Sequence, residues 1–187
     1  GKKTQTELLV NRLKNNNINV KHLEYPNYNS KSSELVKMYL QGEIGDNAND
    51  VNPYLASILF AADRGISFIK EWEKLYENAS TVFIADRYTT SNMLYQATKI
   101  RNIGEKDRYL NWLWDLEFNK IQIPVPDLVL FLDVSNNITR KLTERRPNKI
   151  DNNNVKNIHE NNLIYQKESY ENAKYLTLTN QMTFPTV

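Results

Sequence analysis

The run at residues 81–85, Thr-Val-Phe-Ile-Ala, constrains the fold more than any other stretch of this chain. It is almost wholly apolar and does not alternate with polar residues, so neither of its faces suits water. Such a strand is typical of a parallel sheet that helices cover on both sides. A second run of this kind spans residues 128–134, and a weaker one is predicted at residues 175–179.

Segments whose apolar residues repeat at helical spacing separate these strand-like runs. Residues 4–17 repeat leucines at helical intervals and predict a first helix, which a short strand at residues 18–25 follows until Pro26 stops it. Asn52-Pro53 is typical of a helix start, and we expect a long helix from there to about Tyr76. One face of that helix is marked by Leu55, Ile58, Leu59 and Ala62.

Strands separated by helices predict an α/β fold with a parallel sheet and right-handed crossovers. Ligands of such sheets bind beyond the carboxyl ends of the strands. The sequence therefore places candidate chemistry at residues 1–5, 25–28, 86–96 and 133–146.

Composition narrows the class of protein. The chain has 187 residues, no cysteine and a formal net charge of +2, and we interpret residues 1–187 as one domain. Near-neutral charge argues against a nucleic-acid partner, and the sequence contains no apolar stretch of the roughly 20 residues that span a bilayer. We expect a cytoplasmic protein with small anionic ligands and no membrane partner.

The opening Gly1-Lys2-Lys3-Thr4-Gln5 is similar to the end of a phosphate-binding loop, Gly-x-x-x-x-Gly-Lys-Ser/Thr. Backbone N–H groups and the helix dipole would hold the phosphates of ATP, and Lys2 would add a mobile charge. Lys3 stands where the Mg²⁺-binding Ser or Thr usually stands, and Thr4 could bind the metal only in a shifted register. An ordinary helix start with exposed lysines is the alternative.

The stretch Asp86-Arg87-Tyr88-Thr89-Thr90-Ser91-Asn92-Met93-Leu94-Tyr95-Gln96 resembles a segment of bacterial thymidylate kinases. An acid at the end of a strand can hold Mg²⁺ through water, and the arginine after it can bridge phosphates. The alternative for this pair is a surface salt bridge. The resemblance implies that Ser91, Asn92 and Gln96 contact dTMP, the last two at the thymine edge, and that Tyr95 packs under its sugar.

Two further segments carry the same resemblance. Phe60 and Arg64 are four residues apart on the long helix, so the ring can stack on a base while the guanidinium reaches its carbonyl edge. A core phenylalanine and a solvated arginine are the alternative. Tyr25 and Pro26 are assigned to the dTMP site, but the arginine that often follows in this family is missing, which gives more of the phosphate binding to Arg87.

The basic segment after residues 128–134 resembles the lid that closes over ATP in this family, at about residues 144–155. Arg145 and Arg146 would bind phosphate there, and we favour Arg146 as catalytic. A solvated basic turn is the alternative. The resemblance also implies a homodimer.

Together these features predict a P-loop kinase, with a parallel sheet flanked by helices on both faces and a short basic lid. It would transfer the γ-phosphate of ATP to dTMP with Mg²⁺. The catalytic residues would be Lys2, Asp86, Arg87 and Arg146, with Asp86 serving the metal and Thr4 as a further candidate. One alternative is a P-loop kinase for another nucleotide or nucleoside, and the other is an inactive nucleotide-binding module.

Overall fold

The computed structural model describes residues 1–78, 80–135, 138–139 and 157–178. Two parallel strands lie at its centre, β1 (Asn19–Glu24) and β2 (Thr81–Asp86). Their register runs from Asn19 opposite Thr81 to Glu24 opposite Asp86. The carboxyl ends of both strands therefore meet at one edge, as the α/β prediction required.

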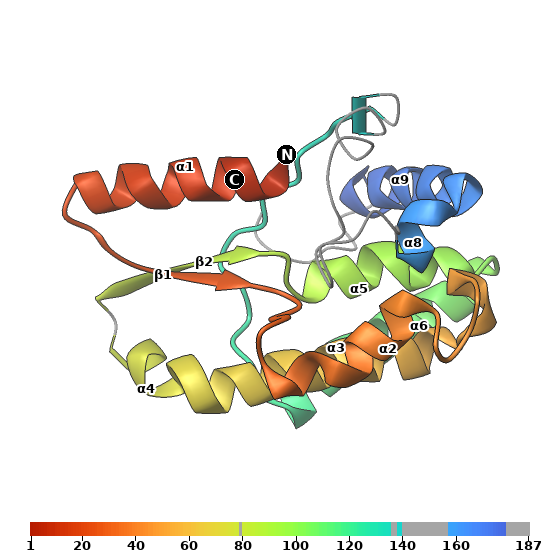
Figure 1. Ribbon diagram of the computed structural model, residues 1–187, viewed down its shortest axis with the longest axis horizontal. Helices are drawn as coiled ribbons and strands as arrows, with labels where there is room; N and C mark the ends of the chain where they lie inside the picture. The colour runs from red at the N-terminus through yellow and green to blue at the C-terminus, as the bar shows by residue number, and fades with distance from the viewer. Residues whose placement is uncertain (79, 136–137, 140–156, 179–187) are drawn as a thin grey trace.

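Helices lie on both faces of the strand pair (Figure 1). Helix α1 (Lys2–Asn15) covers one face, and α3 (Pro53–Ser67) with α4 (Glu73–Tyr76) covers the other. Helix α5 (Thr89–Tyr95) continues beyond the carboxyl end of β2. The other described elements are η1 (Lys31–Ser33), α2 (Glu34–Gln41), η2 (Ala48–Asp50), η3 (Phe68–Trp72), η4 (Ala97–Lys99), α6 (Ile103–Trp114), η5 (Asp115–Lys120), α8 (Ile158–Asn161) and α9 (Leu163–Leu178).

The first helix, both early strands and the long helix are confirmed. The Asn52 side chain accepts a hydrogen bond from the Tyr54 backbone N–H at 2.8 Å, with Pro53 in the first turn, so the predicted cap starts α3. The chain then passes through η3, a π-helical turn, into α4 and reaches Tyr76 as predicted.

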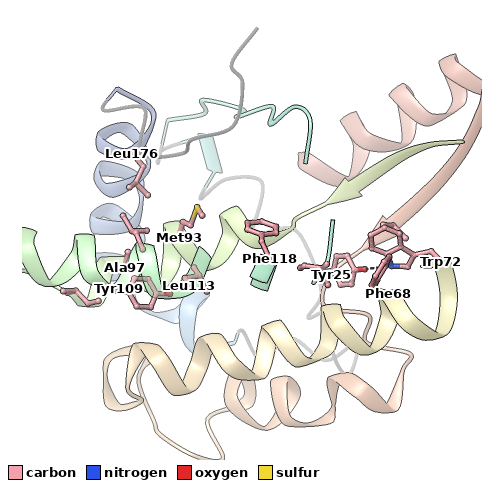
Figure 2. Close-up of a cluster of buried hydrophobic side chains, with 13 residues drawn as sticks. Tyr25, Phe68, Trp72, Met93, Ala97, Tyr109, Leu113, Phe118 and Leu176 are labelled. Carbon is pink, nitrogen blue, oxygen red and sulfur yellow. Dashed lines mark hydrogen bonds between the residues drawn. The ribbon is translucent and has the colours of Figure 1, made fainter. Parts of the chain in front are cut away.

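The main core fills the space between the strands and the helices around them (Figure 2). Its aromatic end is formed by Tyr25, Phe68 and Trp72, where the Trp72 indole N–H donates to the Tyr25 hydroxyl at 3.1 Å. A second cluster lies under α2 and α3 and contains Tyr39 and Tyr165. The main core includes Met93 of α5 and the second cluster includes Ala56 of α3, so buried side chains anchor both helices.

Two predicted strands are wrong. Residues 128–134 form no strand, because a strand needs a hydrogen-bonded partner and none of the described residues pairs with them. Residues 175–178 belong to α9 instead, since Ala173 and Leu176 are buried three residues apart on one side of a helix that packs on α5. Residue 179 lies outside the described residues.

The predicted central position of β2 is also not seen, because β2 pairs with β1 alone within the described ranges. The apolar face marked by Leu55 and Ile58 points outward, and α3 buries small and polar residues such as Ala61 and Asp63 in its place.

In the described part of the chain, no helix is both long and apolar enough to cross a membrane.

Candidate functional site

The carboxyl ends of β1 and β2 bring charged residues together. Asp86 closes β2 and is only 5% exposed. Within the described residues its carboxylate forms no salt bridge, so the surface salt bridge considered for the Asp86–Arg87 pair is not what the structure contains. Lys3 at the start of α1 lies 3.9 Å from the Glu24 carboxylate, which places that helix start beside the same strand ends.

Arg87 adopts a left-handed backbone conformation with φ of 70°, which is unusual for a residue other than glycine and is often found at functional sites. Its guanidinium carbon lies 5.2 Å from the centre of the Tyr95 ring. Interaction with Tyr95 raises the pKa of Arg87 above its ordinary value, so the cation is firmly held. The structure thus brings together two residues that the sequence assigned to the dTMP phosphate and sugar.

Arg64 is buried and paired. It is 2% exposed, and its Nε and Nη2 donate to the Glu117 carboxylate at 2.7 and 2.5 Å. Asn92 Nδ2 also donates to this carboxylate, at 3.3 Å, so Arg64 and Asn92 share one partner. A solvated Arg64 is therefore excluded, while its contact with a base stays a prediction.

A cluster of aromatic residues lies beside Tyr95. The His159 ring stacks on Tyr95 with centres 5.6 Å apart, and its Nε2 lies 2.8 Å from the Tyr39 hydroxyl. Burial, with Lys99 and Arg87 nearby, lowers the pKa of His159 to about 3, so the ring is neutral. Phe60 is half-buried with its ring edge-on to Tyr39 at 6.0 Å.

The remaining predicted residues fall into four groups. Gln96 directly follows α5 and is buried, and its Oε1 has no hydrogen-bond partner within the described chain, while Ser91 is half-buried. Tyr25 and Pro26 are buried, and the Tyr25 hydroxyl donates to Ser67 Oγ at 3.3 Å in the core. The first five residues are exposed. Arg145, Arg146 and the predicted lid lie outside the described residues.

Sequence reasoning missed Glu117, Tyr39, Lys99 and His159 as parts of this site. Glu117 sits in the π-helical segment η5, and such segments occur frequently at functional sites. A lone glutamate or histidine in a helical sequence carries no comparable signal. Only the tertiary structure places Glu117, Tyr39 and His159 against residues of α3 and α5, and Lys99 against Tyr39.

Lys99 supplies a testable pH dependence. Its Nζ donates to the Tyr39 hydroxyl and to the Val51 carbonyl, each at 3.0 Å, and burial lowers its pKa from 10.5 to about 7. Between these values the unfolded chain holds a proton that the folded chain has lost, so Lys99 makes the free energy of unfolding rise with pH.

We expect Lys99→Met to weaken this rise, measured as the change in the free energy of urea unfolding between about pH 7 and pH 9.5. Lys70→Met, at an exposed position, is the matched control and should keep the wild-type slope. A wild-type slope in Lys99→Met would contradict the assignment.

The site has a carboxylate suited to Mg²⁺. Kinase sites hold this ion through one or two carboxylates, substrate phosphates and several waters, so they need no dense ligand cluster. None of the described residues forms a group of three or more His, Cys, Asp or Glu that could hold a metal alone. Asp86, buried at the strand end and outside any salt bridge in the described chain, fits a role through water.

The fold and site define an α/β protein whose candidate ligand site lies at the carboxyl ends of parallel strands. A family model described as thymidylate kinase matches residues 1–184. The chain belongs to the thymidylate kinase family.

Individual relatives agree with this assignment. The chain is similar to a thymidylate kinase of Plasmodium falciparum, at 30% identity over 149 residues, 77% of this chain and 61% of the relative. It is 31% identical over 138 residues to a thymidylate kinase of Mycobacterium tuberculosis, covering 72% of this chain and 61% of that protein. The matched part of the chain thus spans about three-fifths of the length of these curated relatives.

Proposed function

We propose that this protein is a thymidylate kinase with a P-loop kinase fold, which transfers the γ-phosphate of ATP to dTMP to give dTDP and ADP. The observation that carries the proposal is the placement of Asp86, Arg87 and Tyr95 around the end of β2 in a chain of this family. We further propose one domain over residues 1–187 and a cytoplasmic location, which the family resemblance supports.

The reaction is an in-line attack by a dTMP phosphate oxygen on the γ-phosphorus of ATP. The bond from that phosphorus to the oxygen bridging the β-phosphate breaks, and ADP leaves. A phosphate monoester dianion is already nucleophilic, so catalysis consists of positioning and charge neutralisation. Mg²⁺, when bound, would neutralise phosphate charge, and Asp86 would hold it through water, with Thr4 as a further candidate.

Cationic residues would place the two substrates. Arg87, fixed over Tyr95, would bridge the transferring phosphate and the dTMP phosphate. Lys2 and the backbone of residues 1–5 at the start of α1 would hold the ATP phosphates. Arg146, with Arg145, would close over them from the lid.

The aromatic and amide residues would recognise the thymine and its sugar. Phe60 would stack on the base, and Tyr95 would exclude a 2′-hydroxyl. Ser91, Asn92, Gln96 and Arg64 would line the base edge, with Tyr25 and Pro26 at the end of β1. Gln96 Oε1 supports this arrangement, because a buried acceptor without a partner in the described chain suits a hydrogen-bond donor of a ligand.

The test measures dTMP binding by calorimetry beside ADP release in the presence of ATP and Mg²⁺. A thymidylate kinase binds dTMP and releases ADP faster with dTMP than with any other acceptor, and not with ATP alone. Binding without turnover would favour an inactive nucleotide-binding module, and faster turnover with another nucleotide than with dTMP would favour a different P-loop kinase.

A homodimer is supported by the outward apolar face of α3. Leu55, Ile58 and Ile66 are all exposed there at helical spacing, and Ile69 is exposed in η3, which follows directly. Leu35 and Met38 are also exposed on α2, which packs beside α3. An apolar surface of this kind is typical of a subunit interface.

We expect Ile58→Glu to convert the dimer to a monomer in sedimentation velocity, because the substitution buries a charge in the interface. Ile58 is 45% exposed in the isolated chain. Leu8→Glu is the matched control, since Leu8 is 58% exposed on the remote helix α1, and it should leave the dimer intact. An unchanged dimer in Ile58→Glu would place the interface elsewhere.

A further inference from the structure

Glu117 is a buried acid to which the predicted chemistry assigns no role. Its side chain is 0% exposed, and its carboxylate is compensated by four hydrogen bonds that it accepts. Arg64 provides two of them, Thr89 Oγ1 donates at 3.2 Å and Asn92 Nδ2 donates at 3.3 Å. One carboxylate in η5 thus ties α3 to α5, the two helices that carry the candidate base-recognition residues.

These contacts determine which end of the Asn92 amide faces a ligand. The Asn92 nitrogen also donates to the Ser57 carbonyl at 3.2 Å, so both of its N–H groups are used. An ionised carboxylate and a carbonyl can only accept, and the amide cannot turn over without placing its oxygen against them. Asn92 Oδ1, a hydrogen-bond acceptor, is therefore the atom left for a ligand.

The same carboxylate fixes the Arg64 guanidinium. Nε and Nη2 form one edge of the planar group, and both donate to Glu117. Nη1, which can only donate, lies on the edge of the guanidinium that faces away from Glu117. Arg64 Nη2 and Asn92 Nδ2 donate to the same oxygen, Glu117 Oε1, so the two side chains are held in a fixed relation.

We propose that Glu117 is a specificity-determining positioning residue, which holds an acceptor at Asn92 and a donor at Arg64 and so selects a base with an N–H beside a carbonyl. This inference rests on the proposed function. Thymine and uracil present the N3–H donor beside the O4 acceptor. Cytosine presents an unprotonated N3 beside an N4 amino donor, so both contacts would be repulsive.

The test compares dUMP with dCMP, which differ only at this base edge, in wild-type and Glu117→Gln enzyme with ATP and Mg²⁺. Glutamine keeps the size of the side chain but can donate, so it permits the Asn92 amide to turn over. We expect the ratio of kcat/KM for dUMP to that for dCMP to fall about tenfold or more in the variant. A purely structural role would lower both values by the same factor, and an unchanged ratio would overturn the proposal.

Two controls keep the outcome clear. Wild-type turnover of dTMP is measured first, and its absence would reject the proposed function, whereas turnover with an unchanged ratio in Glu117→Gln would reject this inference alone. If Glu117→Gln does not fold, Glu117→Asp replaces it, because it keeps the buried charge opposite Arg64 but draws the carboxylate back by one methylene. The ratio for dUMP over dCMP should fall in this variant too, and retention of the wild-type ratio would overturn the proposal.

Discussion

Replacing Arg87 by methionine is expected to lower kcat with dTMP by about a hundredfold, which is the usual cost of removing one charged contact to a reacting group. Arg87 follows the last residue of β2 and is held over Tyr95 at 5.2 Å, so its charge is already in place before substrate binds. Methionine keeps much of the apolar stem of the side chain but removes the cation. Steady-state kinetics with saturating ATP measures the effect.

Arg87→Lys is the matched control for this change. It keeps the positive charge but loses the planar fork that binds two phosphate oxygens at once, so we expect a kcat between those of the wild type and Arg87→Met. The thermal stability of both variants checks that the fold is retained. A kcat within a factor of about two of the wild type in Arg87→Met would rule out a catalytic role for Arg87.

Arg64→Met is expected to lower the free energy of unfolding by about 3–5 kcal/mol, because it leaves the Glu117 charge buried without its cation. Both side chains of the pair are essentially inaccessible to water, at 2% and 0% exposure. The carboxylate would keep its hydrogen bonds from Thr89 and Asn92, but no opposite charge would replace Arg64. Urea unfolding followed by circular dichroism measures the loss.

The double variant Arg64→Met with Glu117→Leu separates the charge from the packing. It removes both charges and fills the space with apolar groups, so we expect it to be more stable than Arg64→Met alone. If the double variant is the less stable of the two, the destabilisation comes from lost packing and hydrogen bonds and not from an unpaired charge.

Local patterns predicted the elements that local forces determine. The leucine spacing at residues 4–17 and the Asn52-Pro53 cap were sufficient to locate α1 and α3. The apolar run ending at Asp86 located β2, and the rule for parallel sheets then placed the candidate site at its end. The sequence alone thus located Asp86 and Arg87 at that strand end, while their catalytic roles stay a prediction.

Contacts between distant residues were not predictable in this way. An apolar run at residues 128–134 has strand character, but only a neighbouring strand makes it a strand, and the described structure provides none. Arg64 and Glu117 are 53 residues apart, and Tyr39 and His159 are 120 residues apart. No spacing in the sequence reveals such pairs, so the supports of the site appeared only in the folded structure.

The fate of the γ-phosphate tests the central claim most directly. The protein is incubated with dTMP, Mg²⁺ and ATP labelled in the γ-phosphate, and the products are separated. We predict that the label appears in the β-phosphate of dTDP, in an amount equal to the ADP formed. Label found only in inorganic phosphate, or remaining in ATP while dTMP is unchanged, would contradict the assignment of this protein as a thymidylate kinase.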